Sequence, residues 1–136
     1  MNFEGLTGVV VTKESPNYEE CCLAWNRAIN KHPLVIVYCQ NNDDIINAIK
    51  WAKEYKVSFR IRSGTHHYEG YSTGDNLLVI DVSHMNQIEL NDKTVKIQGG
   101  VRNRELYEAV CGAGYPFPGG GCPTVGAVGY TLGGGW

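Results

Sequence analysis

The chain has 136 residues, a net charge of −2, a pI near 6.1 and 43% hydrophobic residues. That length matches one domain or a large piece of one, and this share of apolar residues is enough to bury a core. The slightly acidic balance excludes a strongly basic face, so we expect no nucleic-acid partner. No apolar run approaches the roughly 20 residues of a membrane span, and Met1 to Pro16 lack the apolar run of a signal peptide. We therefore expect a cytoplasmic protein with no membrane partner.

A helix is predicted near the start of the chain. Ser15 and Pro16 are typical of a first helical turn, because serine caps free amides and proline has no amide hydrogen to satisfy. Apolar residues then recur at helical spacing, and these are Tyr18, Cys22, Trp25 and Ile29. Pro33 is expected to end the helix.

Strands and helices alternate in the part that follows. Residues 34–38 are a continuous run of mostly β-branched residues, which is typical of a strand covered on both faces. An acidic helix start at residues 42–44 and apolar residues at helical spacing predict a helix that ends at Lys56. Short strands are predicted at residues 58–61 and 77–81. This order gives strand–helix–strand units.

The pattern changes in the last third of the chain. Residues 87–90 and 94–98 alternate around a polar turn, which predicts an antiparallel hairpin, and residues 101–111 fit a helix. The sequence therefore predicts an α+β fold of two small lobes, residues 1–84 and residues 85–136.

Two glycine-rich stretches contain residues that a core would not require. The first is Arg62 to Ser72, directly after a predicted strand, and the second runs from Gly119 to Trp136. Glycine permits φ > 0 and leaves amide N–H groups uncovered, so a diphosphate can lie directly on the main chain. One stretch carries histidines and the other a cysteine, which points to a common ligand.

A flexible linker is the alternative for the second stretch. Linkers avoid bulky apolar residues, yet Val125, Val128 and Leu132 lie within it, so a phosphate-binding loop is favoured. No Gly-x-Gly-x-x-Gly motif opens a helix after the first strand, and no Gly-Lys-Ser/Thr is present. A dinucleotide would therefore bind by an architecture other than a Rossmann fold or a P-loop.

The cysteines and histidines supply candidate reactive groups. Five cysteines cannot form a fully paired disulfide set, and the absence of Cys-x-x-Cys spacing argues against a metal site. Four are expected to be packed thiols, whereas Cys122 lies in a glycine–proline loop that offers poor burial. His66 and His67 are adjacent, so on an extended backbone only one can face a given ligand atom, and the pattern does not say which. His32 and His84 are expected at the surface.

The two stretches resemble the motifs of a known flavoprotein family. The run Arg62-Ser63-Gly64-Thr65-His66-His67-Tyr68-Glu69-Gly70 resembles the Arg-Ser-Gly-Gly-His-Asp-Tyr-Glu-Gly motif of berberine-bridge-enzyme-like proteins, members of the vanillyl-alcohol oxidase superfamily. Gly121 to Gly126, followed by Gly133 to Gly135, is similar to that family's second motif. The resemblance implies a p-cresol methylhydroxylase-type FAD-binding domain of two small α/β subdomains. The run Gly133 to Trp136 stops inside a glycine loop with no element to close it, so we expect a truncated domain that is the front part of a longer protein.

The resemblance implies a role for each matching residue. His66 would bond the 8-methyl carbon of the flavin and Cys122 its ring carbon 6, so FAD would be held by two covalent bonds. Val125 matches a small residue that admits dioxygen, which favours an oxidase. The full set of expected cofactor-binding residues is Arg62, Ser63, Gly64, Thr65, His66, His67, Ser72, Gly121, Cys122, Val125, Gly126, Tyr130, Leu132 and Gly133.

Three positions depart from the family pattern. Thr65 stands where the family usually has glycine, His67 replaces a common aspartate, and Tyr130 falls where many members carry histidine beneath the flavin. The first change crowds the loop, and the second places another imidazole beside the expected attachment residue.

The resemblance implies an FAD-dependent oxidase that takes hydride from a small-molecule alcohol, sugar or similar donor and gives its electrons to O2. The catalytic base and the substrate domain are expected in the polypeptide beyond Trp136, so residues 1–136 alone are expected to be inactive. Two alternatives stay open: a dehydrogenase with another acceptor, and a non-catalytic nucleotide-binding or assembly module.

Overall fold

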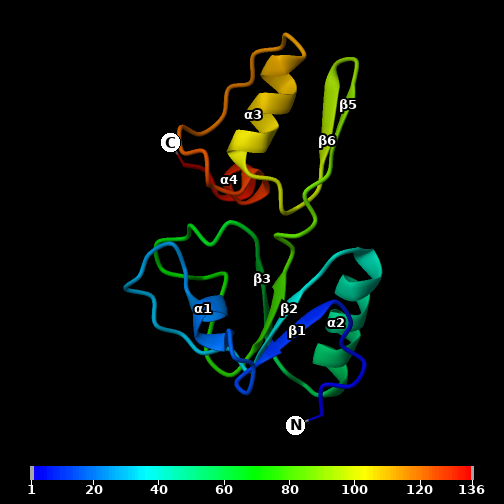
Figure 1. The fold of residues 1–136 in the computed structure, drawn as a ribbon, viewed down its shortest axis with the longest axis vertical. Helices are drawn as coiled ribbons and strands as arrows, with labels where there is room; N and C mark the ends of the chain where they lie inside the picture. Colours follow the sequence, from blue (N-terminus) through cyan, green and yellow to red (C-terminus); the bar gives the residue numbers. More distant parts are fainter. Residues whose placement is uncertain (1, 136) are drawn as a thin grey trace.

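The computed structural model describes residues 2–135. Figure 1 shows a lower part that contains the first four strands and an upper part that contains the hairpin and the last two helices. The elements are β1 (Val9–Thr12), α1 (Tyr18–Cys22), β2 (Val35–Tyr38), α2 (Asn42–Glu54), β3 (Phe59–Arg62), β4 (Leu78–Asp81), β5 (Ile88–Asn91), β6 (Thr94–Ile97), α3 (Asn103–Gly112) and α4 (Ala127–Gly133).

The lower part is a four-stranded sheet with strand order β1-β2-β4-β3. Strands β2, β4 and β3 run parallel, and β1 pairs antiparallel with β2 at the edge. The carboxyl ends of parallel strands lie at the same edge of a sheet, which is where ligands bind in open α/β sheets. The first glycine-rich stretch begins at that edge, directly after β3.

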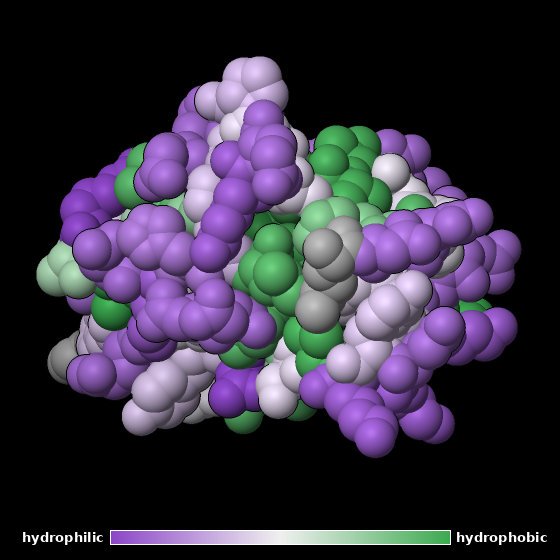
Figure 2. All heavy atoms as spheres, turned by 90° about the horizontal axis from the view of Figure 1, so that it is seen from below, coloured by the Kyte–Doolittle hydropathy of each residue, from purple (hydrophilic) through white to green (hydrophobic). Residues whose placement is uncertain are grey.

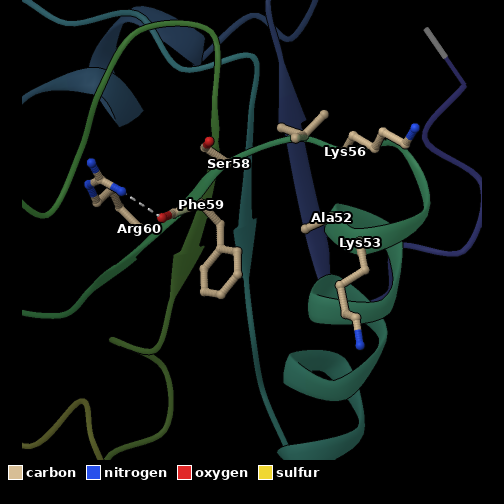
Figure 3. A pocket seen from close by; sticks show the side chains of 7 residues that line it. Ala52, Lys53, Lys56, Ser58, Phe59 and Arg60 are labelled. Carbon is tan, nitrogen blue, oxygen red and sulfur yellow. Dashed lines mark hydrogen bonds between the residues drawn. The ribbon is translucent and has the colours of Figure 1, made fainter.

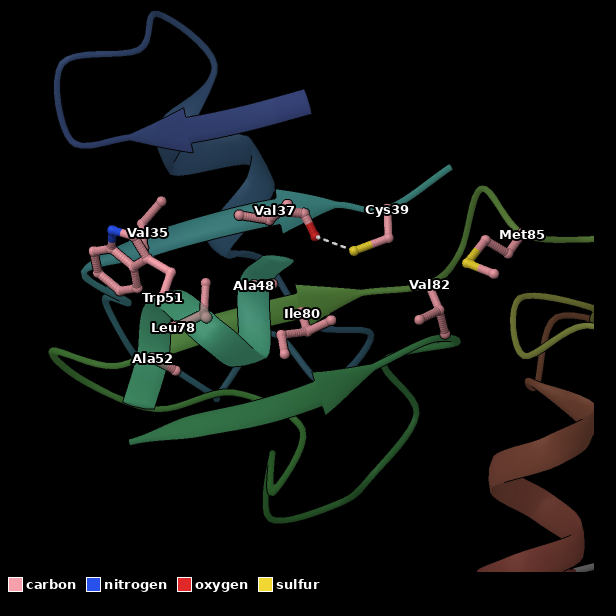
Figure 4. Packing of buried hydrophobic residues seen from close by; sticks show 10 residues of the cluster. All are labelled: Val35, Val37, Cys39, Ala48, Trp51, Ala52, Leu78, Ile80, Val82 and Met85. Carbon is pink, nitrogen blue, oxygen red and sulfur yellow. Dashed lines mark hydrogen bonds between the residues drawn. The ribbon is translucent and has the colours of Figure 1, made fainter. Parts of the chain in front are cut away.

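A helix covers each face of this sheet (Figure 1). Val35 and Val37 of β2 pack with α2, whereas Ile36 between them packs with α1, because side chains alternate along a strand. Figure 4 shows the α2 side, where Trp51 and its neighbours lie against β2 and β4. Helix α2 begins as predicted, since the Asn41 side chain accepts a hydrogen bond from the amide of Asp44.

The upper part has a smaller core. The hairpin β5–β6 packs beside α3 and α4, and its buried centre is Val101, Leu106, Val110 and Ala127. Half-buried side chains of the hairpin cover this cluster on one side.

The predicted buried strands, the hairpin and two of the three predicted helices are confirmed within a few residues. The first helix is wrong in length, because Leu23 is extended (φ −66°, ψ 133°) and ends α1 at Cys22. Trp25 therefore leaves the expected apolar face and is 60% exposed. The sequence did not predict strand β1. It predicted an open loop where the structure has helix α4. The predicted end of that loop, Trp136, lies outside the described residues.

The thiols follow the prediction with one exception. Cys22 and Cys39 are buried and Cys21 is half-buried, but Cys111 is exposed on α3. Cys111 was expected to be packed; the apolar face of α3 is instead made by Leu106 and Val110, which leaves Cys111 on the outer side.

The face on the N-terminal side of the molecule is mainly hydrophilic, with an apolar area near its centre (Figure 2). Among residues 2–135, no helix is long and apolar enough to cross a bilayer.

Candidate functional site

The two glycine-rich stretches meet backbone to backbone between the lower and upper parts. A Cβ on Gly64 would lie 2.5 Å from the amide nitrogen of Gly126, and one on Gly126 would lie 3.0 Å from Oγ of Ser63. Real Cβ atoms essentially never lie under 3.0 Å from another atom, so position 64 requires glycine for this approach, whereas a Cβ at position 126 would need its neighbours to shift slightly. The Ser63 hydroxyl also donates to the carbonyl of Gly99 at 2.7 Å, which ties the first stretch to the upper part.

This approach brings His66 and Cys122 to a common neighbour. The hydroxyl oxygen of Thr124 lies 3.0 Å from Nε2 of His66 and 3.4 Å from Sγ of Cys122. His66 and Thr124 are 58 positions apart in the chain, so the contact depends on the tertiary fold. An imidazole and a thiol therefore lie on either side of one hydroxyl group.

The His66 ring is held from a second direction as well. The indole of Trp25 stacks on it with a centroid distance of 4.6 Å and an interplanar angle of 24°. The amide of Trp25 donates to the carbonyl of Thr65 at 3.2 Å, which keeps the two segments together. Burial lowers the pKa of His66, and the positive charge of Arg102 acts in the same direction, although the contact with Thr124 opposes both. The imidazole is therefore favoured in its neutral form.

Cys122 is exposed and lies at the start of a turn that is fixed to α3. The Asn103 side chain donates to the Cys122 carbonyl at 3.1 Å, and the Asn103 amide donates to the carbonyl of Val125 at 2.9 Å. The hydrogen bond from Thr124 lowers the pKa of the Cys122 thiol, and the amide of Val125 adds to this effect. The site thus favours a neutral imidazole and raises the share of Cys122 present as thiolate, and these are the nucleophilic forms of the two groups.

His67 lies outside this arrangement. Its ring stacks on Tyr71 with a centroid distance of 4.4 Å, its Nδ1 accepts the amide of Glu69, and the side chain is exposed. The sequence left His66 and His67 as alternatives, and only His66 is brought to Cys122.

The main chain of the first stretch offers free donors. Among residues 2–135, the amides of Gly64, Thr65 and His66 donate to no protein acceptor. Thr65 adopts φ 59°, a left-handed conformation that is rare for a β-branched residue. Successive free amides of this kind form an anion-binding concavity, which suits a pyrophosphate.

Arg62 is placed differently from the other predicted residues. Its side chain is 3% exposed, and its Nε donates to Asp81 at 2.5 Å. The remaining nitrogens donate to the Cys21 carbonyl at 2.8 Å and to the Tyr38 hydroxyl at 3.1 Å. The guanidinium thus has a structural role: its hydrogen bonds link β3 to β4 and to α1.

The other predicted residues surround the site without joining the central contact. Ser72, Val125 and Tyr130 are half-buried, whereas Gly121 and Gly133 are exposed. Leu132 is 84% exposed on α4.

Sequence reasoning missed three contributors to the site: Trp25, Arg102 and Asn103. Trp25 was assigned to a helix face, and the other two carry no local signal. Thr124 was part of the quoted motif but received no role.

Hollows in the surface lie elsewhere. A shallow cavity of about 380 Å³ lies between the end of α2 and the start of β3, lined by Lys53, Lys56, Phe59 and their neighbours (Figure 3). A second of about 230 Å³ lies between the N-terminal segment and α2. Neither contains a predicted site residue, and the first is at the amino end of β3, away from the ligand-binding edge. No cluster that could ligate a metal occurs in the described part of the chain.

A known protein family covers most of this chain. The family described as FAD binding domain matches residues 33–136. The FAD-linked oxidoreductase YgaK of Bacillus subtilis, described as uncharacterized, is 43% identical over 132 residues, which make up 96% of this chain and 29% of YgaK.

Solved structures give the same result. Berberine-bridge-enzyme-like 1 of Physcomitrella patens has a TM-score of 0.90 and 34% identity, covering 96% of this chain and 29% of that protein. The grass pollen allergen Phl p 4, described as having glucose dehydrogenase activity, has a TM-score of 0.85 and 30% identity, covering 94% of this chain and 29% of the allergen. A Phl p 4 double variant described as a glucose oxidase has a TM-score of 0.83 and 31% identity over 93% of this chain and 29% of that protein.

The chain thus spans just under a third of each of these proteins. The predicted p-cresol methylhydroxylase-type α+β fold is confirmed by the neighbours. The chain belongs to the FAD binding domain family, and the proteins it is similar to include berberine-bridge-enzyme-like proteins.

Proposed function

We propose that this chain is the FAD-holding part of a flavin-dependent oxidase whose cofactor is attached through both His66 and Cys122. The observation that carries the proposal is the meeting of these two nucleophiles at Thr124, at distances of 3.0 and 3.4 Å. FAD, when bound, supplies hydride acceptance from an alcohol, sugar or similar C–H donor and transfer of the electrons to O2, which yields H2O2.

The residues present fit this cofactor. The unpaired amides of Gly64, Thr65 and His66 form a donor-lined bend for the pyrophosphate. His66 and Cys122 lie close enough to reach two edges of one ring, since both contact the same hydroxyl group. Two attachments fix the ring's orientation relative to any substrate, which is the positioning a hydride donor needs.

The choice of O2 as acceptor is supported by Val125. This half-buried residue is three positions after Cys122, and its amide donates to the Cys122 carbonyl, so its small side chain is held beside the attachment point. Phl p 4 is described as having glucose dehydrogenase activity, whereas a double variant of it is described as a glucose oxidase. Two substitutions on this scaffold therefore accompany a change of acceptor. A dehydrogenase with another acceptor is the second candidate.

The rest of the chemistry is assigned to other parts of the polypeptide. Among the residues that the structure describes, no carboxylate and no second imidazole hydrogen-bonds to His66. We propose that the substrate domain and the catalytic base come from the remainder of the protein, since this chain covers only 29% of the relatives it matches.

The full-length protein, denatured in acid and digested, tests the attachment. We expect flavin on the peptides of both His66 and Cys122 by mass spectrometry. Cys122→Ala should retain flavin on His66 only, and the exposed Cys111→Ala variant is the matched control with both bonds. Wild-type protein with flavin on neither peptide would contradict the proposal and favour a reversible nucleotide-binding module.

Acceptor use is tested on the same preparation. An oxidase should form one H2O2 for each O2 consumed, and Val125→Ile should slow reoxidation by O2 while leaving reduction by substrate unchanged. Reoxidation that is slow in the wild type and unaffected in Val125→Ile would favour the dehydrogenase.

A further inference from the structure

Thr124 lies between the two attachment residues and contacts both. Its position is fixed by the turn from Cys122 to Val125, in which the Val125 amide donates to the Cys122 carbonyl at 3.4 Å. Asn103, at the start of α3, donates from its side chain to the Cys122 carbonyl and from its amide to the Val125 carbonyl. The hydroxyl is therefore placed by α3, not by a flexible loop.

The two contacts restrict how protons can be arranged. A hydroxyl has one proton to donate and two lone pairs, so it can donate in only one of its two hydrogen bonds. When the sulfur is a thiolate it can only accept, and the hydroxyl proton must point to it. Nε2 of His66 must then carry a proton and donate to Oγ1 of Thr124.

We infer that Thr124 is a positioning residue for flavin attachment, whose single hydroxyl orients the Cys122 thiolate and holds His66 in the tautomer with Nδ1 unprotonated. This inference rests on the proposed function. In this tautomer the lone pair on Nδ1 is the nucleophile, and no described residue hydrogen-bonds that nitrogen. One hydroxyl therefore prepares both nucleophiles together.

The stacking of Trp25 supports this role. The indole fixes the plane of the His66 ring, and the bond to Thr124 fixes its rotation within that plane. The lowered pKa of Cys122, to which the Thr124 hydrogen bond contributes most, agrees with a thiolate that accepts from this hydroxyl. Arg102 is the charged group that acts on His66, and its positive charge disfavours a second ring proton.

The attachment chemistry balances with dioxygen as the oxidant. Each bond would replace one C–H bond of the flavin by a C–N or C–S bond and would release that proton to solvent; the two electrons would pass to O2, which takes up two protons from solvent to give H2O2. Thr124 keeps its proton throughout, because it acts only by orienting its two neighbours.

The test compares Thr124→Val, which keeps the shape and removes the hydroxyl, with Thr124→Ser, which keeps the hydroxyl. Full-length protein prepared without flavin is treated with iodoacetamide across a pH series, and modification of Cys122 is followed on its own peptide, with the exposed Cys111 as internal control. Loss of one hydrogen bond to a charged group corresponds to about tenfold, so we expect Thr124→Val to react about tenfold more slowly at low pH, with its pH profile displaced upward. Thr124→Ser should match the wild type, and Cys111 should not change in either variant.

The second measurement follows attachment after FAD is added to the same proteins. We expect flavin to appear on both peptides at the wild-type rate in Thr124→Ser and about tenfold more slowly in Thr124→Val. Two results overturn the inference: a Thr124→Val profile identical to the wild type, or a Thr124→Ser variant that is folded by circular dichroism and as slow as Thr124→Val. If Thr124→Val does not fold, Thr124→Ala replaces it under the same criteria. Absence of flavin from the wild type would reject the proposed function instead, and the alkylation profiles would still decide the role of the hydroxyl.

Discussion

The lower and upper parts of the molecule differ in how completely they are packed. In the lower sheet β2 and β4 are almost wholly buried, with a helix on each face. In the upper part, three of the four residues of β5 are exposed, and the hairpin is a sheet of only two strands. Two-stranded sheets are marginally stable unless they pack on something else. The lower part is thus expected to supply most of the stability.

The candidate site uses both parts. His66 comes from the lower part and Cys122 with Thr124 from the upper part, and the two meet because Gly64 and Gly126 approach closely. The rigid sheet fixes one nucleophile, whereas the other depends on how the upper part docks. Paired substitutions, one in each part, can test this division.

The largest difference in stability between the two parts is expected when one ion pair is removed from each. Asp81→Ala removes the partner of the buried Arg62, and an uncompensated buried charge lowers the free energy of unfolding by about 3 to 5 kcal/mol. Glu89→Ala removes the exposed ion pair with Lys96 in the hairpin. This substitution is expected to lower the free energy of unfolding by only about 0.5 kcal/mol. Urea unfolding followed by far-ultraviolet circular dichroism measures both. The double variant Arg62→Met with Asp81→Leu should recover part of the loss, and equal effects of Asp81→Ala and Glu89→Ala would contradict the comparison.

The second-largest difference in stability is expected when the same substitution, isoleucine to alanine, is made in the core of each part. Ile80 of β4 is fully buried, so Ile80→Ala is expected to destabilise by about 3 kcal/mol through lost burial and a cavity. Ile97 of β6 is only half-buried, and Ile97→Ala should cost about 1 kcal/mol. Thermal unfolding of the two variants gives this comparison directly. A larger loss for Ile97→Ala would mean that the upper part carries the main core.

The junction between the parts is tested by adding one methyl group. Gly64→Ala places a Cβ 2.5 Å from the Gly126 amide, so the two backbones must separate, at a cost of about 1 to 3 kcal/mol. Flavin on Cys122 should then decrease more than flavin on His66, because the upper part is displaced from the ring. Gly112→Ala, at the end of α3, is the matched control, since nothing lies within 4 Å of its Cβ. Unchanged attachment in Gly64→Ala would show that the close approach is not needed.

Much of the fold could be read from local patterns. Burial along a strand determines which residue types it contains. This is why β2 and β4 have runs of β-branched residues and why apolar residues alternate in the hairpin. The end of α1 and the existence of α4 could not be read in this way. Trp25 fits a helical period but stacks on His66 instead, and α4 forms although Gly129 lies within it, because Ala127 is anchored in the upper core.

The sequence predicted which residues belong to the site, but it did not predict the contacts between them. Motif resemblance pointed to His66 and Cys122, yet adjacency of His66 and Thr124 across 58 positions has no trace in local spacing. Arg62 lies in the motif, but its side chain serves a buried ion pair with Asp81. A motif therefore identifies a segment more reliably than it assigns each side chain in it.

The smallest change in stability is expected from relieving backbone strain at Thr65, in the first glycine-rich stretch. Thr65 adopts φ 59°, where a β-branched side chain is strained by about 1 to 2 kcal/mol, and glycine would remove that strain. Glycine also gives the unfolded chain more freedom, by about 0.5 to 1 kcal/mol, so Thr65→Gly should stabilise by no more than about 1.5 kcal/mol. Asn76→Gly at φ 55° is the control, and it should give no gain because asparagine tolerates this conformation. If Thr65→Gly is destabilising by thermal unfolding, the threonine side chain must make a compensating contact, and the bend that presents His66 is held by more than its backbone.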